Sequence, residues 1–358
     1  MEGKPHAVLM AGGSGTRFWP ASRQARPKQF LEIGTDAPLL VATAERLEGL
    51  LPPENIWVVT GAEHAELVRT LLPNIPADQI LAEPVGRNTL PCVALATAAI
   101  ARVDPDAVQL VLPADHVVSP PEALRSILAA AVAEAQATPG ALFTLGIEPT
   151  FPATGYGWIE MGERLGERDA HTVHRVERFV EKPNLKDAQT FLSAGRFLWN
   201  GGVFVWRNDA IQAALAKYAP GTWAALQDVP ANDGQALAAA YADLESTPID
   251  IGVLERAEDV RVLPVAFTWN DVGTWSSIPD VVQPDADGNF VDGDVRVISV
   301  DATGNVVHAP KGQTVALLGV QDLVVVRTDD AILVCPRDRA QDVRAIVARL
   351  ESEAPDTL

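Results

Sequence analysis

The feature that most constrains the fold is a repeated alternation of apolar runs and helical patterns over residues 1–150. Near-continuous apolar segments occur at 7–13, 56–61, 79–84, 108–116 and 141–147. Segments such as 38–51 (PLLVATAERLEGLL) separate them and repeat apolar residues at helical spacing. Strands without polar alternation are typical of parallel sheets that helices cover on both faces. The pattern therefore predicts a doubly wound α/β domain with a mixed, mainly parallel, Rossmann-like sheet.

Two helix starts are marked by capping residues. Ser119-Pro120-Pro121-Glu122 has the form of a capping box, which predicts a helix running toward Gly140. Asn184 predicts the N-cap of a helix that ends at Gly195.

A turn-rich break at 283–290 (QPDADGNF) divides the chain. Beyond it, short β runs alternate with Gly, Asp and Asn turns, and a last amphipathic helix follows. We therefore predict two domains, an α/β domain over 1–282 and a small β domain with a terminal helix over 283–358.

Charge and hydropathy exclude several classes of protein. The chain has 28 Lys and Arg against 47 Asp and Glu, a net charge of -19, so most of its surface would repel nucleic acids and anionic membranes. No apolar run approaches the roughly 18 residues of a membrane span, and we expect no leader before the first strand. The two cysteines, Cys92 and Cys335, lie in apolar stretches, which favours buried thiols over a disulfide. We expect a cytoplasmic protein that binds neither nucleic acid nor membrane.

Polar residues follow several of the predicted strands. They are Gly12-Gly13, Glu83-Pro84 and Asp115-His116. Ligands of doubly wound sheets bind at the carboxyl ends of the strands. We therefore expect these three loops to face one crevice.

The first of these loops carries glycines and then cations, in the stretch LMAGGSGTRFWPASRQARPKQF (9–30). The spacing fits neither a dinucleotide fingerprint nor a P-loop. Three glycines in four positions let backbone N–H groups converge on an anion, and a nearby Arg and Lys suit a polyphosphate. The predicted nucleotide-binding residues here are Ala11, Gly12, Gly13, Ser14, Gly15, Thr16, Arg17 and Lys28. The alternative is a glycine turn made only for packing.

Asp115 and Asp271 each follow an apolar run and could project from a strand end. Their carboxylates suit Mg²⁺, a hard ion that takes few protein ligands. On the residues alone, a turn or helix-cap role for each aspartate remains the alternative. We assign His116 no catalytic role, because no second histidine lies at ligand spacing.

The opening stretch resembles the signature of nucleotidyltransferases that make nucleoside-diphosphate sugars, in the form found in bacterial mannose-1-phosphate guanylyltransferases. Further motifs resemble the family in the same order: EPVGRNT (83–89), LPADH (112–116), TGYGWIE (154–160), FVEKP (179–183), WNGGVFVW (199–206) and WNDVGTW (269–275). The combination is more specific than any single motif.

The resemblance implies a division of roles among the matching residues. The implied catalytic set is Arg17, Lys28, Asp115, Lys182 and Asp271, with Asp115 and Asp271 as Mg²⁺ ligands. The implied sugar-binding set is Gly155, Glu181, Lys182, Asn200, Gly201 and Asp250. Because Glu181 and Lys182 are adjacent at a predicted strand end, we expect their side chains to diverge to opposite faces.

The sequence gives the weakest indication of which residues recognise the nucleotide base. Glu83, Asn88 and Thr89 are assigned to the nucleotide site, and Asn88 with Thr89 could offer an amide and a hydroxyl to guanine. Equally, these two residues could cap the helix that follows.

The family resemblance implies transfer of GMP from GTP to α-D-mannose 1-phosphate by direct attack. The alternatives are the same chemistry on another sugar 1-phosphate or nucleotide, and a non-catalytic nucleotide-sugar sensor.

The C-terminal β segment resembles the family's partial left-handed β-helix. We expect it to pack on the catalytic domain or on a second subunit, which leaves a homodimer open. It is too short for the isomerase domain that some members carry, so we expect no isomerase activity.

Overall fold

A computed structural model describes residues 4–13 and 15–358. Contacts divide the chain into two compact units. The first unit contains Met1–Gly12, Arg46–Pro113 and Ser119–Thr268, and the second contains Gly13–Glu45, Ala114–Val118 and Trp269–Leu358. Each unit combines segments that are far apart in the sequence. The predicted boundary at 282/283 instead divides the chain into two continuous stretches. That boundary stays a prediction.

The first unit is built on one large sheet. Its strands, in sheet order, are β3 (Ile80–Glu83), β2 (Ile56–Gly61), β1 (Pro5–Ala11), β4 (Val108–Pro113), β9 (Phe197–Arg207), β6 (Leu142–Ile147), β10 (Val260–Val265), β8 (His171–Glu181) and β7 (Gly157–Arg168). Parallel pairs join β3–β2–β1–β4 and β6–β10, while β9 runs antiparallel to both β4 and β6. The predicted mixed, mainly parallel, Rossmann-like sheet is confirmed.

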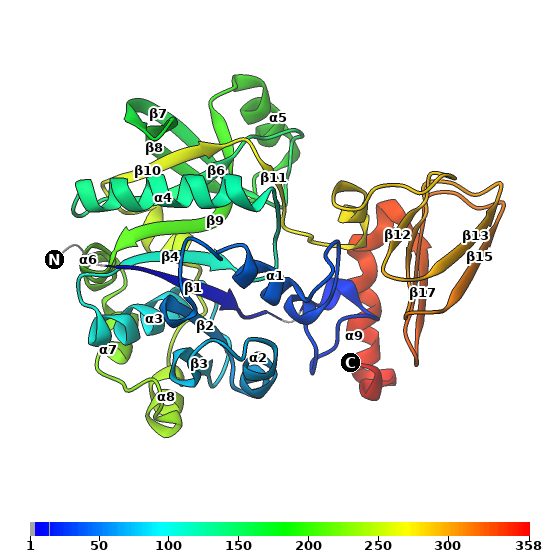
Figure 1. Ribbon diagram of the computed structural model, residues 1–358, viewed down its shortest axis with the longest axis horizontal. Helices are drawn as coiled ribbons and strands as arrows, with labels where there is room; N and C mark the ends of the chain where they lie inside the picture. Colours follow the sequence, from blue (N-terminus) through cyan, green and yellow to red (C-terminus); the bar gives the residue numbers. More distant parts are fainter. Residues whose placement is uncertain (1–3, 14) are drawn as a thin grey trace. The chain divides into compact units, whose positions relative to one another are not determined.

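Helices cover this sheet (Figure 1). They are α2 (Ala65–Leu71), α3 (Thr89–Val103), α4 (Pro121–Ala137), α5 (Leu185–Ala194), α6 (Asn208–Tyr218), α7 (Pro220–Leu226) and α8 (Gly234–Tyr241). In β1, Val8 belongs to the core cluster under α3, and the neighbouring Leu9, which alternates to the other face, is also fully buried. Burial on both faces explains why the strands lack polar alternation.

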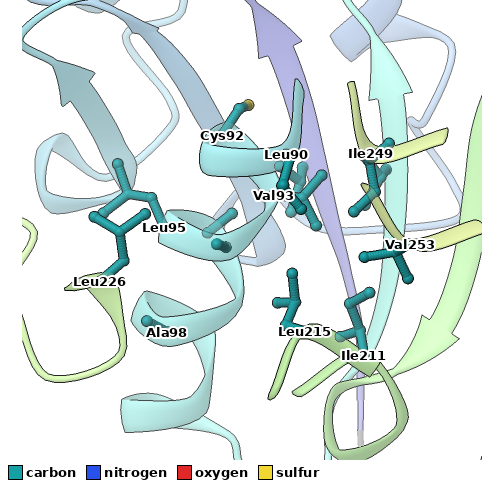
Figure 2. Packing of buried hydrophobic residues seen from close by; sticks show 14 of the residues in the cluster. Leu90, Cys92, Val93, Leu95, Ala98, Ile211, Leu215, Leu226, Ile249 and Val253 are labelled. Atoms are coloured by element: carbon teal, nitrogen blue, oxygen red, sulfur yellow. The ribbon is translucent and has the colours of Figure 1, made fainter. Parts of the chain in front are cut away.

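Helix α3 is apolar on nearly every side and lies in the middle of this core. Figure 2 shows its Leu90 and Val93 beside Ile249 and Val253, with Leu215 of α6 close by. The chain around Val253 forms the short π-helical segment η6 (Asp250–Leu254). Because packing anchors both ends of η6, Asp250 is held at a defined place at the edge of the core.

The second unit contains the C-terminal β strands. One sheet has the order β12 (Phe290–Asp292), β14 (Val306–His308), β16 (Leu323–Arg327) and β17 (Ile332–Pro336), and a second pairs β13 (Arg296–Val300) with β15 (Thr314–Leu318). Pairing is parallel from β12 to β16 and between β13 and β15, as stacked turns of a β-helix require. The predicted small β domain is confirmed, and it ends in α9 (Val343–Glu353).

This β region packs on an early segment of the chain. A hydrophobic cluster joins Phe18 and Trp19 to Trp275, to Val306 of β14 and to Val343 of α9. The same unit holds α1 (Leu39–Glu45) and a small pair of strands, β5 (Val117–Ser119) with β11 (Thr268–Asn270). Of the two expected packing partners, residues before the predicted boundary are thus contacted within the second unit, and packing on a second subunit stays a prediction.

One of the two predicted helix caps is wrong. Ser119 ends strand β5, so the residue preceding α4 is Pro120, which has no side-chain acceptor and makes no cap hydrogen bond. Because Ser119 belongs to strand β5, it is not in the N-cap position that the capping box requires. Asn184 does cap α5, accepting from the Asp187 N–H at 3.0 Å, and Gly195 ends that helix with φ 67°.

Among the described residues, no helix combines the length and the apolar character needed to cross a bilayer. Cys92 and Cys335 are both free thiols, the first buried and the second half-buried.

Candidate active site

Lys28 contacts two other predicted catalytic residues in the second unit. It begins the 3-10 turn η2 (Lys28–Phe30) directly after Pro27, and only 6% of it is exposed. Its Nζ donates to Oδ2 of Asp115 at 2.8 Å and to the backbone oxygen of Asp271 at 2.5 Å. Asp115 follows β4 and Asp271 follows β11, so two strand ends meet at one ammonium. Three of the five predicted catalytic residues are therefore together.

The surroundings of Asp115 keep its carboxylate charged. Burial favours the neutral acid, but the charge of Lys28, the neighbouring His116 and the hydrogen bond from Lys28 outweigh it and lower the pKa of Asp115. An ionised carboxylate is a suitable ligand for a hard cation. Among the described residues, no group of three or more His, Cys, Asp or Glu side chains is placed to hold a metal ion. Mg²⁺ commonly takes one or two carboxylates with substrate phosphates, so this donor set fits that ion.

Arg17 contacts the loop that follows Asp271. It belongs to the 3-10 turn η1 (Thr16–Phe18), and its Nη1 donates to the Gly273 carbonyl at 3.4 Å. The backbone of Asp271 is held in turn by Asn270, whose Oδ1 accepts from the Val272 N–H at 2.6 Å. Asn270 was missed by sequence reasoning, although it stands inside the motif that contains Asp271.

Gly15 brings the glycine loop against Lys28. Its φ is 56°, and a Cβ there would stand 2.5 Å from Cβ of Lys28 and 2.8 Å from its backbone nitrogen. Ser22 donates to the Gly15 carbonyl at 2.8 Å, and Gln29 donates to the Gly13 carbonyl at 3.4 Å. No sequence signal singled out Ser22 or Gln29. Ser14 lies outside the described residues.

In the first unit, Glu83 lies beside the start of the glycine loop. It ends β3 with 4% exposure, and its Oε2 lies 3.9 Å from where a Cβ on Gly12 would stand. Ala11 ends β1, where its carbonyl accepts from Thr60 at 3.1 Å. Tyr241, which sequence reasoning missed, donates to Oε1 of Glu83 at 3.1 Å. Burial raises the pKa of Glu83 to about 7, and the Tyr241 hydrogen bond lowers it in part.

Asn88 and Thr89 make the contacts of a helix start. Asn88 has φ 69°, and its Oδ1 accepts from the Thr89 N–H at 2.9 Å. The Thr89 hydroxyl accepts from the Ile249 N–H at 2.9 Å, which ties α3 to the segment before η6. The capping alternative is thus present, and base contact by these residues stays a prediction.

Several predicted sugar-binding side chains meet in the first unit. Asn200 of β9 donates to Oδ1 of Asp250 at 2.6 Å and accepts from the Gly202 N–H at 3.1 Å. A Cβ on Gly157 would stand 2.7 Å from Oε2 of Glu181 and 3.3 Å from Cβ of Asn200, so a side chain there would require the Glu181 carboxylate to shift. Burial raises the pKa of Asp250 to about 6, against the Asn200 hydrogen bond that lowers it, and nearby Glu181 raises it further.

The two predicted sugar-site glycines, Gly155 and Gly201, differ in surroundings. A Cβ on Gly155 would have no described heavy atom within 4 Å, other than chain neighbours. A Cβ on Gly201 would stand 3.2 Å from Cδ1 of Ile147, so Gly201 is packed against the sheet. Ligand contact by either residue stays a prediction.

The prediction that Glu181 and Lys182 diverge is wrong. The ammonium of Lys182 contacts the carboxylate of Glu181 in an ion pair. Lys182 has φ 44°, outside the extended region, so the alternation of a strand no longer applies to it. The pair is partly exposed, with 63% of the Lys182 side chain accessible.

Comparisons with known proteins agree with this architecture. The family model described as "Nucleotidyl transferase" matches residues 6–288, and the model described as "MannoseP isomerase/GMP-like beta-helix domain" matches 295–350. Fold and matches together define an enzyme of the nucleotidyl transferase class with an appended β-helix domain.

Relatives narrow the class. The mannose-1-phosphate guanylyltransferase of Escherichia coli (strain K12) is 39% identical over 98% of this chain and 74% of its own length. The xanthan biosynthesis protein XanB of Xanthomonas campestris pv. campestris (strain B100) is 39% identical over 96% of this chain and 73% of its own. The chain belongs to the mannose-1-phosphate guanylyltransferase family.

Solved structures give the same fold. A crystal structure described as a mannose-1-phosphate geranyltransferase from Thermus thermophilus matches with a TM-score of 0.89 and 39% identity, covering 98% of this chain and 100% of that one. A structure described as a mannose-6-phosphate isomerase from Helicobacter pylori matches with a TM-score of 0.60 and 24% identity, over 75% of this chain and 99% of that one. The second likeness concerns the fold alone.

Proposed function

We propose that the protein transfers GMP from GTP to α-D-mannose 1-phosphate, forming GDP-mannose and pyrophosphate. The observation that carries this is the meeting of Asp115 and the Asp271 loop at the Lys28 ammonium, in a chain of this family. Such a set of cation and carboxylates suits the handling of a triphosphate.

In the proposed reaction, a phosphate oxygen of mannose 1-phosphate attacks the α-phosphorus of GTP in line. The new O–P bond forms as the bond between the α-phosphorus and the bridging oxygen breaks, and pyrophosphate leaves with the electron pair. The attacking phosphate is already an anion at neutral pH, so no side-chain base or nucleophile is needed. Catalysis then depends on positioning and on charge neutralisation.

The cationic side chains have distinct tasks in this proposal. Lys28, buried and fixed by two oxygens, pairs with the triphosphate together with Arg17. Backbone N–H groups of the glycine loop donate to the same phosphates. Lys182, whose side chain is largely exposed beside Glu181, pairs with the phosphate of the sugar.

Asp115 and Asp271 are the residues that would hold Mg²⁺. A bound Mg²⁺ would neutralise charge on the phosphates as the bond to pyrophosphate breaks. Lys28 orients Asp115 through its carboxylate and the Asp271 loop through its backbone.

Glu181, Asn200 and Asp250 would recognise the hexose. Carboxylates accept from sugar hydroxyls, and an amide can both donate and accept. The hydrogen bond from Asn200 to Asp250 fixes the orientation of both groups before the sugar binds. Such preorganisation lowers the cost of binding.

The test is a panel of GTP, ATP, UTP and dTTP, each combined with mannose, glucose and galactose 1-phosphates, read by pyrophosphate release. We expect the highest kcat/KM for GTP with mannose 1-phosphate. A higher kcat/KM for another combination would change the assigned substrates but leave the proposed type of reaction unchanged. Tight GDP-mannose binding without any turnover would instead support a sensor.

A further inference from the structure

Two consecutive residues at the end of α8 hold the loop between β3 and α3. Tyr241 donates to Oε1 of Glu83 at 3.1 Å, and the carbonyl of Ala242 accepts from Nη2 of Arg87 at 3.1 Å. Tyr241 is fully buried, and Glu83 is 4% exposed. This loop carries the residues assigned to the nucleotide, so α8 braces it at both ends.

The Tyr241 contact determines how the Glu83 carboxylate is presented. With Oε1 engaged by the phenol, Oε2 points toward Gly12, 3.9 Å from the position of a Cβ there. Each carboxylate oxygen has two acceptor sites, so both can still accept from a ligand. The carboxylate is therefore fixed at the start of the glycine loop.

A fixed carboxylate discriminates between purines. Guanine presents two adjacent donors on its Watson–Crick edge, N1–H and the 2-amino group, whereas adenine presents an acceptor at N1. A carboxylate accepts from both guanine donors and repels the adenine acceptor. A site built to hydrogen-bond a substrate group rejects the analogue that lacks it by large factors.

We propose that Tyr241 is a positioning residue for base selection, whose hydroxyl holds Glu83 so that the carboxylate accepts from N1–H and the 2-amino group of guanine. This inference rests on the proposed function. It assigns a specificity role to a side chain 158 positions from Glu83 in the chain.

Ionisation of Glu83 should make the preference for guanine depend on pH. Burial raises the pKa of Glu83 to about 7, with the Tyr241 hydrogen bond lowering it in part. Among the described residues, the titratable groups facing Glu83 are the phenol of Tyr241 and the thiol of Cys92. Burial, and then the charge of Glu83, raise the pKa of both, so both are neutral at pH 7. Preference for guanine should therefore weaken as pH falls through about 7.

The experiment compares Tyr241→Phe with Tyr218→Phe, a matched loss of one hydroxyl on the partly exposed surface of α6. For each protein, kcat/KM is measured with GTP and with ATP, both with mannose 1-phosphate, from pH 6 to 9. The ratio of the two values cancels the titration of the phosphates, which both nucleotides share.

We expect the GTP-to-ATP ratio to fall roughly tenfold in Tyr241→Phe, mainly through KM for GTP, and to stay unchanged in Tyr218→Phe. The pH at which the ratio declines should move upward in Tyr241→Phe, because the hydrogen bond that lowers the Glu83 pKa is lost. An equal fall for both nucleotides, or an unchanged ratio, would overturn the inference.

Glu83→Gln provides a second route if Tyr241→Phe fails to fold. It keeps the shape of the side chain and an oxygen for Tyr241, but replaces one acceptor by a donor. A GTP-to-ATP ratio of kcat/KM in Glu83→Gln as high as in the wild type would overturn the inference.

The wild-type protein tests the proposed function separately. Preference for another sugar 1-phosphate refutes that function, while the GTP-to-ATP ratio measured with that sugar still tests the role of Tyr241.

Discussion

Lys28 contacts two oxygens that come from chain positions 87 and 243 residues away. The glycine loop packs tightly against the backbone of Lys28. A Cβ at Gly15 would stand 2.5 Å from Cβ of Lys28, closer than real Cβ contacts allow. At the scale of single residues, the arrangement therefore depends on the missing side chain of Gly15 as much as on the charge of Lys28.

Gly15→Ala should displace Lys28 and lower kcat/KM by at least roughly 100-fold, because a misplaced catalytic group can cost that much. Gly312→Ala is the matched control: Gly312 has φ 77°, and a Cβ there would meet no described heavy atom within 4 Å, apart from chain neighbours. The control should lose about 1 kcal/mol of unfolding free energy and keep its activity. Steady-state kinetics and urea unfolding of both variants check this. Equal activities in the two variants would refute the role given to Gly15.

The residue types made Lys28, Asp115 and Asp271 candidates, and the family resemblance of the surrounding motifs assigned them catalytic roles. Tyr241 could not be found in this way. It is an ordinary apolar-face position of a helix, and only the fold brings its hydroxyl to Glu83. The Glu181–Lys182 contact was also missed, because a positive φ at a non-glycine residue has no sequence signal.

At the scale of elements, η6 presents Asp250 from the edge of a packed core. Burial raises the pKa of this carboxyl from 3.8 to about 6, so folding disfavours its charged form. Its contribution to stability is thus most favourable below pH 4 and is lost as pH rises from about 4 to about 6.

Asp250→Asn removes this titration and keeps an oxygen for Asn200. The unfolding free energy of the wild type, relative to the variant, should therefore decrease between pH 4 and pH 7 and then level off. Urea unfolding of both proteins at several pH values measures the difference. A difference that does not change with pH would show that Asp250 titrates in the folded protein as it does in the unfolded chain.

The β domain has its own anchor within the second unit. Asp292, at the end of β12 and 4% exposed, accepts from the Gly34 N–H at 2.9 Å and pairs with Nδ1 of His308 at 2.8 Å. The His308 ring lies 5.2 Å from the ring of Trp275, which in turn packs on Phe18 at 4.8 Å. The element thus supports the segment that carries Arg17.

Asp292→Ala leaves the Gly34 N–H without its acceptor, which should cost about 1–3 kcal/mol of unfolding free energy. It should also lower kcat, because support for Trp275 and Phe18 is weakened. Asp294→Ala, at a mostly exposed aspartate paired with Lys311, is the control and should change stability by less than about 0.5 kcal/mol. Chemical denaturation and kinetics measure both. If Asp292→Ala has the same unfolding free energy as Asp294→Ala, Asp292 does not anchor the β domain.

At the scale of the whole molecule, hydrophobic periodicity predicted the sheet class and the β character of the C-terminal segment. It could not predict which distant segments join one compact unit. Residues 13–45 and 269–358 share a core because Phe18 and Trp19 pack against β14 and α9, and such pairing is a property of the folded chain. The Ser119 cap failed for a related reason, since pairing of β5 with β11 overrode a local signal.

The residues assigned to phosphate, metal, base and sugar fall in both units. Arg17, Lys28, Asp115 and Asp271, assigned to phosphate and metal, all belong to the second unit. Glu83, Glu181, Asn200 and Asp250, assigned to base and sugar, all belong to the first. Lys182, assigned to the phosphate of the sugar, also belongs to the first unit. The products of the proposed reaction test these assignments.

The most direct measurement is ³¹P NMR of the purified protein incubated with GTP, mannose 1-phosphate and Mg²⁺. GDP-mannose and pyrophosphate should appear in equal amounts as GTP and mannose 1-phosphate disappear. Release of inorganic phosphate with GDP, or no change in the spectrum from a folded protein, would contradict the proposed function.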